Sequence, residues 1–310
     1  MPLDPYIAAK AERIVGLVRS DLEDPEARAR FHEYFADDEP WTRPAELTVS
    51  DEVVDGPGGP IPVRVYRPPL ESAAPLVWMH GGGFAFGDLD MPEADMVSSE
   101  LAARAGCTVI SVDYRLATPE VPFPAPVDDV LAVWQRFAAS SPLGAPAIGG
   151  ASAGAALAVS TALRARDEGL VMPRALLLAY PFLHFPNPAP ESDLALELAA
   201  LPPLLRITPE GVEVMVRGYV GRLSGLPPLA MPGGADPSGL PEAHIVVAEL
   251  DDLRPSAELF ERQLNERGIT TRVELAAGMP HGHLNRLPSV PAVAASLDFF
   301  TRALRSTPAR

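Results

Sequence analysis

The sequence predicts an α/β protein in which helices cover both faces of a mostly parallel sheet of about eight strands. From about residue 46 onward, short apolar runs alternate with longer amphipathic stretches, a pattern typical of parallel strands joined by crossover helices. The chain has 310 residues, of which 47% are hydrophobic, so it can bury a substantial core. Near its middle, residues 150–154 read Gly-Ala-Ser-Ala-Gly and join an apolar run to a helical pattern of small residues.

The expected strands are short aliphatic runs bounded by Gly, Pro or polar residues. Between the first two runs, residues 55–59 read Asp-Gly-Pro-Gly-Gly, a turn sequence that makes this pair a hairpin. We expect strands near 48–54, 61–66, 76–79, 108–112, 147–151, 175–179, 244–248 and 271–275.

The expected helices have apolar residues at three- and four-residue spacing with charged residues between them. Before the first strand, this pattern includes Ile7, Ile14, Val15 and Val18 and predicts amphipathic helices within residues 1–45. Thr208 followed by Pro209 is a typical helix start and leads into the pattern at 212–219. Further helices are expected near 93–105, 127–140, 153–168, 256–267 and 290–305.

Ser152 lies at the turn between the predicted strand at 147–151 and the helix after it. A strand–turn–helix with the pattern Gly-x-Ser-x-Gly strains the serine backbone and exposes its hydroxyl group above the sheet. The flanking Gly150 and Gly154 are expected where strand and helix come too close for side chains. Ala153 would offer an unpaired N–H at the helix N-terminus, which can stabilise an oxyanion. A simple glycine-rich corner would produce the same pattern, so the neighbouring motifs decide between the two readings.

A second glycine motif, His80-Gly81-Gly82-Gly83, directly follows the strand pattern at 76–79. Three consecutive glycines free the backbone to turn its N–H groups toward a ligand, which a simple turn does not require. A loop of this type completes an oxyanion hole beside a nucleophilic serine, with His80 and Gly81 as its supporting part. It therefore favours Ser152 as a nucleophile.

The base and its acidic partner should follow the serine in the order Ser, Asp or Glu, His. Among six histidines, His281 is the preferred base because it lies on a Gly- and Pro-rich loop after a late strand. His283 is the weaker alternative. Asp251 and Asp252 both follow the strand near 244–248, at the edge where α/β enzymes assemble their sites. We expect one of them to orient the imidazole and the other to cap the next helix.

In combination, these motifs resemble those of bacterial carboxylesterases of the hormone-sensitive-lipase-like family, in the α/β-hydrolase superfamily. The similarity extends nearly from end to end, and the order of the motifs is highly specific. The similar segments are 59–68, 80–90, 113–117, 122–125, 128–129, the serine turn, 238–241, 248–249 with Asp251, and 278–279 with 281–282.

The resemblance implies an α/β-hydrolase fold with a catalytic triad of Ser152, Asp251 and His281. It implies an oxyanion hole formed by the N–H groups of Gly82, Gly83 and Ala153. The expected reaction is hydrolysis of short- to medium-chain carboxylic esters through an acyl-enzyme, without a metal or organic cofactor. The expected partner is a small-molecule ester, and the resemblance also allows a homodimer. With Asp251 as the acid, Asp252 becomes the residue expected to cap the helix that contains Pro255.

The expected organisation is one catalytic domain with a helical cap. Residues 46–181 and 228–310 should form the two parts of the catalytic domain. The stretch 182–227 is rich in leucine and interrupts the alternation after the sixth strand, so we interpret it as a lid over the substrate pocket. Residues 1–45 are the expected N-terminal part of the cap.

The sequence departs from the family pattern at five positions, one of which is Ala155 in place of the second Gly of the doublet that usually follows the nucleophile. Ala151 replaces the usual Asp before the nucleophile, an exchange that bears on pocket polarity rather than on the chemistry. Thr118 is an apparent insertion in the loop 113–121, Asp252 stands in place of a usual Pro, and His283 replaces an aromatic residue. None of these changes removes a catalytic group.

Other activities could use the same triad. An amidase or formamidase would need the same residues, although esters are easier to hydrolyse than amides. A lactone or lipid hydrolase would differ in the shape of the pocket alone. A non-catalytic ligand receptor on the same fold would normally lack a triad residue, and all three are present here.

Composition excludes several classes of partner. The net charge of −16 argues against nucleic acid or an anionic membrane, since both require a basic surface. Cys107 is the sole cysteine and lies in an apolar strand pattern, where we expect an inert core residue. The N-terminus has no apolar signal core, and no run of about 18 apolar residues occurs, so the expected compartment is the cytoplasm.

Overall fold

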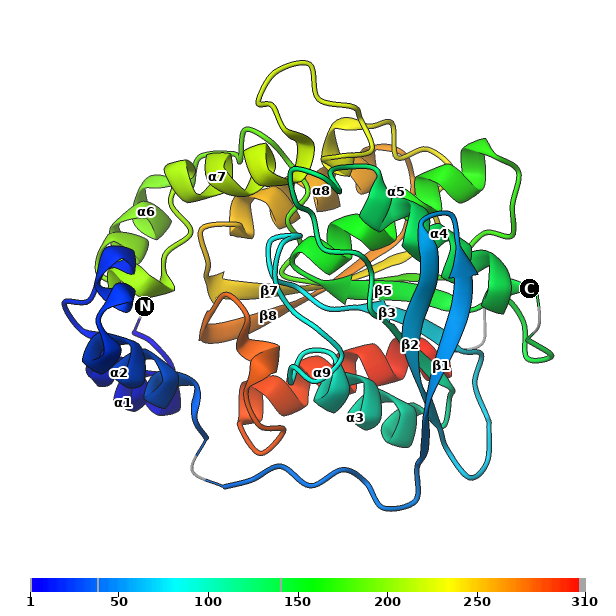
Figure 1. The fold of residues 1–310 in the computed structure, drawn as a ribbon, viewed down its shortest axis with the longest axis horizontal. Helices are drawn as coiled ribbons and strands as arrows, with labels where there is room; N and C mark the ends of the chain where they lie inside the picture. The colour runs from blue at the N-terminus through cyan, green and yellow to red at the C-terminus, as the bar shows by residue number, and fades with distance from the viewer. Residues whose placement is uncertain (1, 38, 140, 307–310) are drawn as a thin grey trace.

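The computed structural model describes residues 2–37, 39–139 and 141–306. Its centre is a sheet with the strand order β1-β2-β4-β3-β5-β6-β7-β8 (Figure 1). The first two strands form an antiparallel hairpin, β2 is antiparallel to β4, and the remaining neighbours are parallel. These strands are β1 (Thr48–Gly56), β2 (Gly59–Arg67), β3 (Leu76–Met79), β4 (Val109–Val112), β5 (Ala147–Ala151), β6 (Leu176–Ala179), β7 (Ala243–Leu250) and β8 (Thr271–Pro280).

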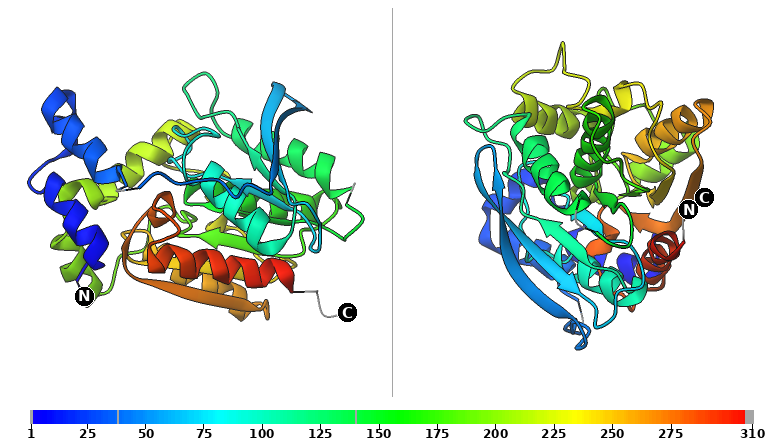
Figure 2. Two further views of the ribbon diagram at one scale, coloured as in Figure 1. Left: turned by 90° about the horizontal axis from the view of Figure 1, so that it is seen from below. Right: turned by 90° about the vertical axis from the view of Figure 1, so that its right-hand side faces the viewer.

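Helices cover both faces of the sheet, as Figures 1 and 2 show. One face carries α3 (Asp95–Ala105) and α9 (Pro291–Arg305), and the other carries α4 (Ala125–Ala138), α5 (Ala153–Asp167) and α8 (Arg254–Glu266). Each face has its own cluster of buried apolar side chains. Since α5 consists largely of alanine and other small residues, it packs close to β5 and is buried along most of its length. The expected α/β class with both faces covered is confirmed.

The predicted strands and helices occur in the predicted order, and most of their ends differ by no more than a few residues. The largest difference lies in β8, which continues to Pro280 through residues that the glycine and proline content predicted as loop. The apparent insertion at Thr118 is accommodated in a turn, where its side-chain oxygen accepts hydrogen bonds from the N–H groups of Glu120 and Val121. Cys107 is fully buried, and burial raises the pKa of its thiol to about 12, as expected for an inert core residue.

The N-terminal segment is broken into short helices. Besides α1 (Pro5–Ala11) and α2 (Pro25–Phe35) it contains the 3₁₀ turns η1 (Glu12–Ile14) and η2 (Arg19–Glu23). The helical spacing therefore does not continue to Val18, as the sequence pattern suggested. The helical run ends at Ile14, Val15 is extended and 61% exposed, and Gly16 then turns the chain with a left-handed φ of +78°.

A second helical segment lies between β6 and β7. It contains α6 (Ser192–Ala199), η3 (Pro203–Leu205) and α7 (Pro209–Val220), and Thr208 caps α7 through its side chain as predicted. Both views of the fold place α1 and α2 beside α6 at one end of the sheet (Figures 1 and 2). The contact is apolar, because Leu204 and Leu205 pack against the cluster that contains Ile14 and Tyr34.

Candidate active site

Ser152 occupies a strained turn between β5 and α5. Its backbone has φ +52° and ψ −113°, a conformation that non-glycine residues rarely adopt. The two flanking glycines are needed sterically. A Cβ on Gly150 would lie 2.5 Å from the carbonyl carbon of Gly154, and a Cβ on Gly154 would lie 2.3 Å from the Met79 oxygen. The sequence prediction about these glycines is thus matched by the close approach of β5, β3 and α5.

The pairing of β7 with β8 brings Asp251 and His281 together. An irregularity near Ala248 shifts the register so that Leu250 pairs with Pro280. Asp251 directly follows β7 and His281 directly follows β8, so this pairing places the two residues next to each other. Glu249 supports this pairing, because its carboxylate accepts a hydrogen bond of 2.7 Å from the Gly278 N–H.

Three side chains form a continuous chain of polar contacts at this edge of the sheet. His281 Nε2 lies 2.9 Å from Ser152 Oγ, and His281 Nδ1 lies 2.7 Å from Asp251 Oδ2. With the Nδ1 proton donated to the carboxylate, Nε2 is left as the acceptor for the serine proton. The second oxygen of Asp251 accepts from the Leu253 N–H at 2.8 Å, which fixes the carboxylate in place.

The surroundings of His281 alter its protonation. Burial lowers the pKa of His281, but the charge and hydrogen bond of Asp251, together with the charges of Glu93 and Asp252, raise it more strongly. The pKa of His281 therefore lies above its ordinary value. An imidazole of this kind is suited to take a proton and to hold it as an imidazolium.

The glycine loop lies against the serine turn. Gly82 has φ +108° and Gly83 has φ +59°, and a Cβ on Gly82 would lie 2.0 Å from the Phe86 carbonyl oxygen. Among the described residues, the N–H groups of Gly82, Gly83 and Ala153 have no hydrogen-bond acceptor. These three predicted oxyanion donors are therefore available to a ligand.

The supporting residues of this loop are buried. His80 Nδ1 lies 2.7 Å from the Gly81 carbonyl oxygen, and the His80 ring stacks on Tyr114 with the ring centroids 4.5 Å apart. Burial lowers the pKa of His80, which favours a neutral ring. His80 is thus packed within the glycine loop, and its ring makes no hydrogen bond to Ser152, His281 or Asp251.

The structure separates the two aspartates, and the expected capping role of Asp252 is wrong. Asp252 accepts hydrogen bonds from the Arg206 guanidinium at 2.8 and 2.9 Å and from the Ile207 N–H. It therefore anchors the segment that precedes α7, while the first residues of α8 receive no side-chain cap. Sequence reasoning missed this role because its partner lies 46 positions away.

His283 is buried and contacts neither Ser152 nor Asp251 through a hydrogen bond. Its Nε2 lies 3.0 Å from Ser296 Oγ, and the Tyr180 ring centroid lies 5.1 Å from its own. Burial, with a smaller contribution from the charge of His281, lowers the pKa of His283 to about 3. His283 cannot serve as the base in this arrangement, so the preference for His281 agrees with the geometry.

Comparison with known proteins places this site in a family. Residues 76–285 match the model of a protein family described by the alpha/beta hydrolase fold. The chain belongs to this alpha/beta hydrolase family. The predicted membership and fold are confirmed, and the matched range contains Ser152, Asp251 and His281.

Relatives of this alpha/beta hydrolase include two proteins of Mycobacterium tuberculosis. Esterase LipI is 36% identical over 272 residues, which cover 84% of this chain and 82% of the relative. Carboxylesterase NlhH is 36% identical over 266 residues, with 80% of this chain and 79% of the relative covered. Among solved structures, the esterase of Pyrobaculum calidifontis is 32% identical, with a TM-score of 0.78 and 98% of both chains covered.

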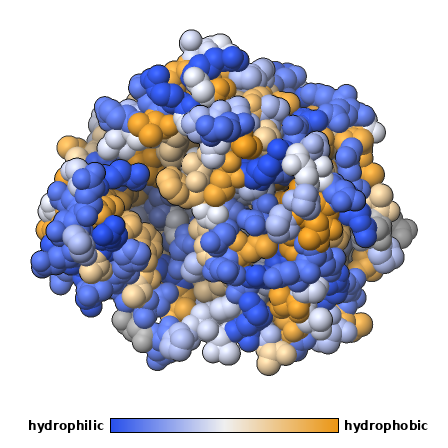
Figure 3. Space-filling view, in the orientation of Figure 1, coloured by the Kyte–Doolittle hydropathy of each residue, from blue (hydrophilic) through white to orange (hydrophobic). Residues whose placement is uncertain are grey.

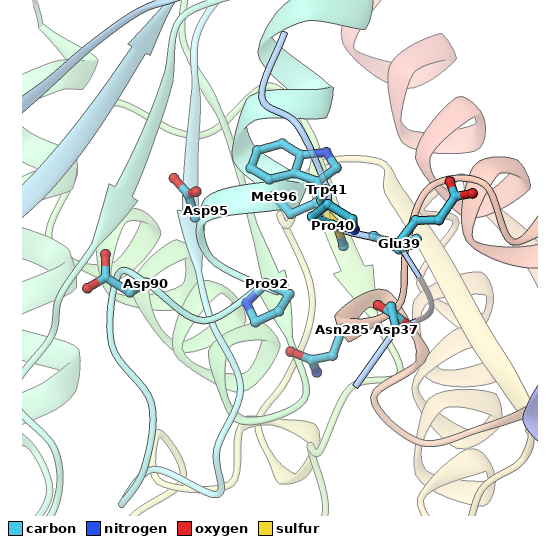
Figure 4. Close-up of a pocket in the computed structure, with 10 residues that line it drawn as sticks. Asp37, Glu39, Pro40, Trp41, Asp90, Pro92, Asp95, Met96 and Asn285 are labelled. Atoms are coloured by element: carbon cyan, nitrogen blue, oxygen red, sulfur yellow. The ribbon is translucent and has the colours of Figure 1, made fainter. Parts of the chain in front are cut away.

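This alpha/beta hydrolase has an acidic hollow beside α3 that is separate from Ser152. The hollow has a volume of about 440 Å³ and lies between Asp37 and residues 39–41, the start of α3 and the segment after His281 (Figure 4). Its lining includes Asp37, Glu39, Trp41, Asp95 and Asn285. Ser152, His281 and Asp251 do not line it. On the face shown in Figure 3, the surface is also hollowed between the N-terminal helices and the rest of the molecule.

In the part of the chain that the structure describes, no helix is sufficiently long and apolar to cross a bilayer.

Sequence reasoning missed one buried carboxylate in this site. The helical pattern predicts Glu93 as the first residue of a helix, but Glu93 precedes α3 and is 2% exposed. Its side chain accepts hydrogen bonds from Gly81 of the glycine loop and from Tyr180 beside His281. No sequence signal identifies it, because Gly81 and Tyr180 lie 12 and 87 positions away.

Proposed function

We propose that this protein is a serine carboxylesterase that hydrolyses short- to medium-chain carboxylic esters through an acyl-enzyme intermediate. The observation that carries the proposal is the unbroken contact from Asp251 through His281 to Ser152, with distances of 2.7 and 2.9 Å. The names of the relatives, esterase and carboxylesterase, support the same class of substrate.

In the first half of the proposed reaction, Ser152 Oγ attacks the ester carbonyl carbon while its proton passes to His281 Nε2. Asp251 holds the ring with Nδ1–H directed at its carboxylate and stabilises the imidazolium that forms. The tetrahedral intermediate then collapses. The C–O bond to the alcohol breaks, and the leaving oxygen takes the proton from Nε2, which leaves the acyl group on Ser152.

In the second half, a water molecule takes the place of the alcohol. His281 Nε2 removes a proton from this water, and the hydroxide oxygen attacks the acyl carbon. Collapse of the second intermediate returns the proton to Ser152 Oγ and releases the carboxylic acid. Both halves use the same base, so no external oxidant, reductant or cofactor is required.

The proposed oxyanion hole consists of the N–H groups of Gly82, Gly83 and Ala153. Each of them lacks an acceptor within the described residues, and Ala153 begins α5, where the helix dipole also favours negative charge. Loss of a single donor of this kind costs about 10²–10³ in kcat in comparable enzymes.

We further propose that residues 1–45 and 182–227 form a cap over the catalytic domain of residues 46–181 and 228–310. Two contacts support this division. A Cβ on Gly83 would lie 2.8 Å from the Met215 sulfur of α7, so α7 covers the oxyanion loop. Arg286 follows His281 in the chain, and its guanidinium lies 4.3 Å from the ring centroid of Tyr34 in α2. Residence in the cytoplasm and formation of a homodimer remain predictions from the sequence.

The proposal is tested with p-nitrophenyl esters of increasing acyl length beside the matching p-nitroanilides. We expect ester turnover to exceed anilide turnover at every chain length, with the best esters among the short and medium acyl chains. Ser152→Ala should lower ester kcat by about 10³-fold or more, with a residual rate from the remaining groups. Faster cleavage of the anilides would establish the amidase alternative, and undiminished turnover by Ser152→Ala would refute the proposed mechanism.

A further inference from the structure

Glu93 is a buried carboxylate that directly contacts the proposed catalytic machinery without belonging to it. Its Oε2 accepts a hydrogen bond of 2.6 Å from the Gly81 N–H. Its Oε1 accepts from the Tyr180 hydroxyl at 2.5 Å and from the Asn285 amide at 3.1 Å. A carboxylate that is removed from water is costly unless such partners compensate it, so this arrangement calls for a reason.

The backbone of Glu93 is fixed on both sides. Its N–H donates to Asn285 Oδ1 at 3.3 Å, and its carbonyl oxygen accepts from the Trp78 indole at 2.9 Å. Asn285 thus contacts Glu93 through both ends of its amide, and the same residue lines the acidic hollow of Figure 4. The carboxylate therefore has a preset position before any substrate binds.

The first contact leads from Glu93 to the oxyanion loop. A Cβ on Gly81 would lie 2.5 Å from Glu93 Oε2 and 3.3 Å from Ser152 Cβ, so Gly81 lies between the carboxylate and the serine. Gly82 and Gly83, whose N–H groups are the proposed oxyanion donors, follow in the chain. A displacement of Gly81 would move these donors away from the position that the oxyanion occupies.

The second contact leads to the imidazole through Tyr180. The Tyr180 ring packs edge-on against His281, with ring centroids 4.9 Å apart, and its hydroxyl group donates to Glu93. Tyr180 also has φ +35°, which is rare for a bulky residue and persists when the surroundings hold it. The Glu93 carboxylate accepts the hydrogen bond that ties this ring to the segment before α3, beside His281.

We propose that Glu93 is a positioning residue that holds the oxyanion loop through Gly81 and the His281 ring through Tyr180, and that its negative charge favours the imidazolium of His281. This inference rests on the proposed function, because it assigns Glu93 to the same ester hydrolysis. It adds a second carboxylate to the site. Glu93 precedes Ser152 in the chain, whereas Asp251 follows it.

The charged and titratable groups around Glu93 are compatible with an ionised carboxylate. Burial raises the pKa of Glu93 above its ordinary value, and its bonds to Tyr180, Gly81 and Asn285 together with the charge of His281 offset only part of that rise. The Gly81 N–H and the Asn285 NH₂ group are hydrogen-bond donors alone, so each needs an acceptor oxygen on Glu93. Other titratable groups near this cluster are Asp251, beyond His281, and Tyr114, whose hydroxyl donates to the Gly81 carbonyl. His80 lies against the same carbonyl, and His283 packs on the Tyr180 ring.

The test compares Glu93→Gln with Asp95→Asn in the full-length protein. Asp95 lies on the same segment and accepts hydrogen bonds from Arg43 and Tyr66. Asp95→Asn is therefore a matched control, because it removes one carboxylate that does not contact the residues around Ser152. For a p-nitrophenyl ester, we expect Glu93→Gln to lower kcat by about 10- to 100-fold, the scale of a misplaced catalytic group, with KM within about twofold. We also expect the acidic limb of its pH profile for kcat/KM to move to lower pH. Asp95→Asn should leave kcat, KM and the limb unchanged.

A subtler variant, Tyr180→Phe, keeps the ring and removes its bond to Glu93. It should lower kcat several-fold, move the acidic limb in the same direction and add little to Glu93→Gln in the double variant. This variant decides the question if Glu93→Gln does not fold. An inactive wild-type protein would refute the proposed function itself. An active wild type with unchanged kcat and pH limb in the folded variant, or the same changes in Asp95→Asn, would overturn the role of Glu93 alone.

Discussion

Arg206 donates two hydrogen bonds to Asp252, so the residue next to Asp251 anchors the segment that leads into α7. Asp251 and Asp252 are adjacent in the chain, yet one contacts His281 and the other contacts the helical segment between β6 and β7. The two carboxylates therefore have separable tasks. One lies in the proposed triad, and the other connects the edge of the sheet to the proposed cap.

The first prediction compares the two aspartates. Asp251→Asn should lower kcat by about 10⁴-fold, because it favours the wrong imidazole tautomer and removes the charge that stabilises the imidazolium. Asp252→Asn should lower kcat far less, but it weakens charged hydrogen bonds to Arg206 and should cost about 1.5–3 kcal/mol of stability. Ester kinetics and urea unfolding measure the two effects. A larger kcat loss at Asp252 than at Asp251 would mean that the acid is assigned one residue too early.

The second prediction concerns pH. Since the pKa of His281 is raised above its ordinary value and the base must be neutral, kcat/KM should decline as the pH falls through that raised pKa. The decline should lie at a higher pH than an unperturbed histidine, near 6.5, would give. Asp251→Asn removes the strongest raising influence and should move the residual limb to lower pH. A wild-type limb below that of a free imidazole would contradict the assignment.

The third prediction concerns the turn at Ser152. In Gly154→Ala the new methyl group would lie 2.3 Å from the backbone oxygen of Met79, which cannot move without displacing β3. We expect a loss of about 3 kcal/mol or more in unfolding free energy, at the upper end for overpacking. Gly218 of α7 is the matched control, because a Cβ there meets no atom within 4 Å. Gly218→Ala should be neutral or stabilising by up to about 1 kcal/mol, and equal losses in both variants would refute the steric argument.

The fourth prediction concerns the N-terminal helices. Removal of residues 1 to about 40 would uncover Leu204 and Leu205 and expose Arg286, a residue that is 2% exposed in the full chain. We expect lower esterase activity, a changed preference for acyl length and increased binding of an apolar dye. The far-ultraviolet circular dichroism of the sheet should persist. A truncated protein with the original rate and chain-length preference would show that this segment packs on the enzyme without shaping its pocket.

Sequence reasoning succeeded where local geometry dictates the residue. The strained turn at Ser152 requires the two glycines that flank it, and the glycine loop follows a strand with no room for side chains. These requirements are written in consecutive residues. Asp251 and His281 could also be predicted, since both follow strands that a parallel sheet brings to the same edge.

Long-range contacts explain what the sequence did not reveal. The task of Glu93 depends on partners that lie 12, 87 and 192 positions away, and a lone glutamate before a helix carries no mark of them. The ion pair of Asp252 with Arg206 is also a long-range contact. Local capping preference instead predicted that Asp252 caps the next helix. The break at Val15 and Gly16 was not predicted, because the extended and left-handed backbone there overrides a helical spacing of apolar residues.

The most direct test of the proposed mechanism is to map the residue that reacts with a fluorophosphonate serine probe. One equivalent of probe should attach to the peptide that contains Ser152, abolish ester hydrolysis in proportion to labelling, and react far more slowly with His281→Ala. The prediction rests on the 2.9 Å contact between His281 Nε2 and Ser152 Oγ. An adduct on another residue, or full esterase activity in protein labelled at Ser152, would contradict the account.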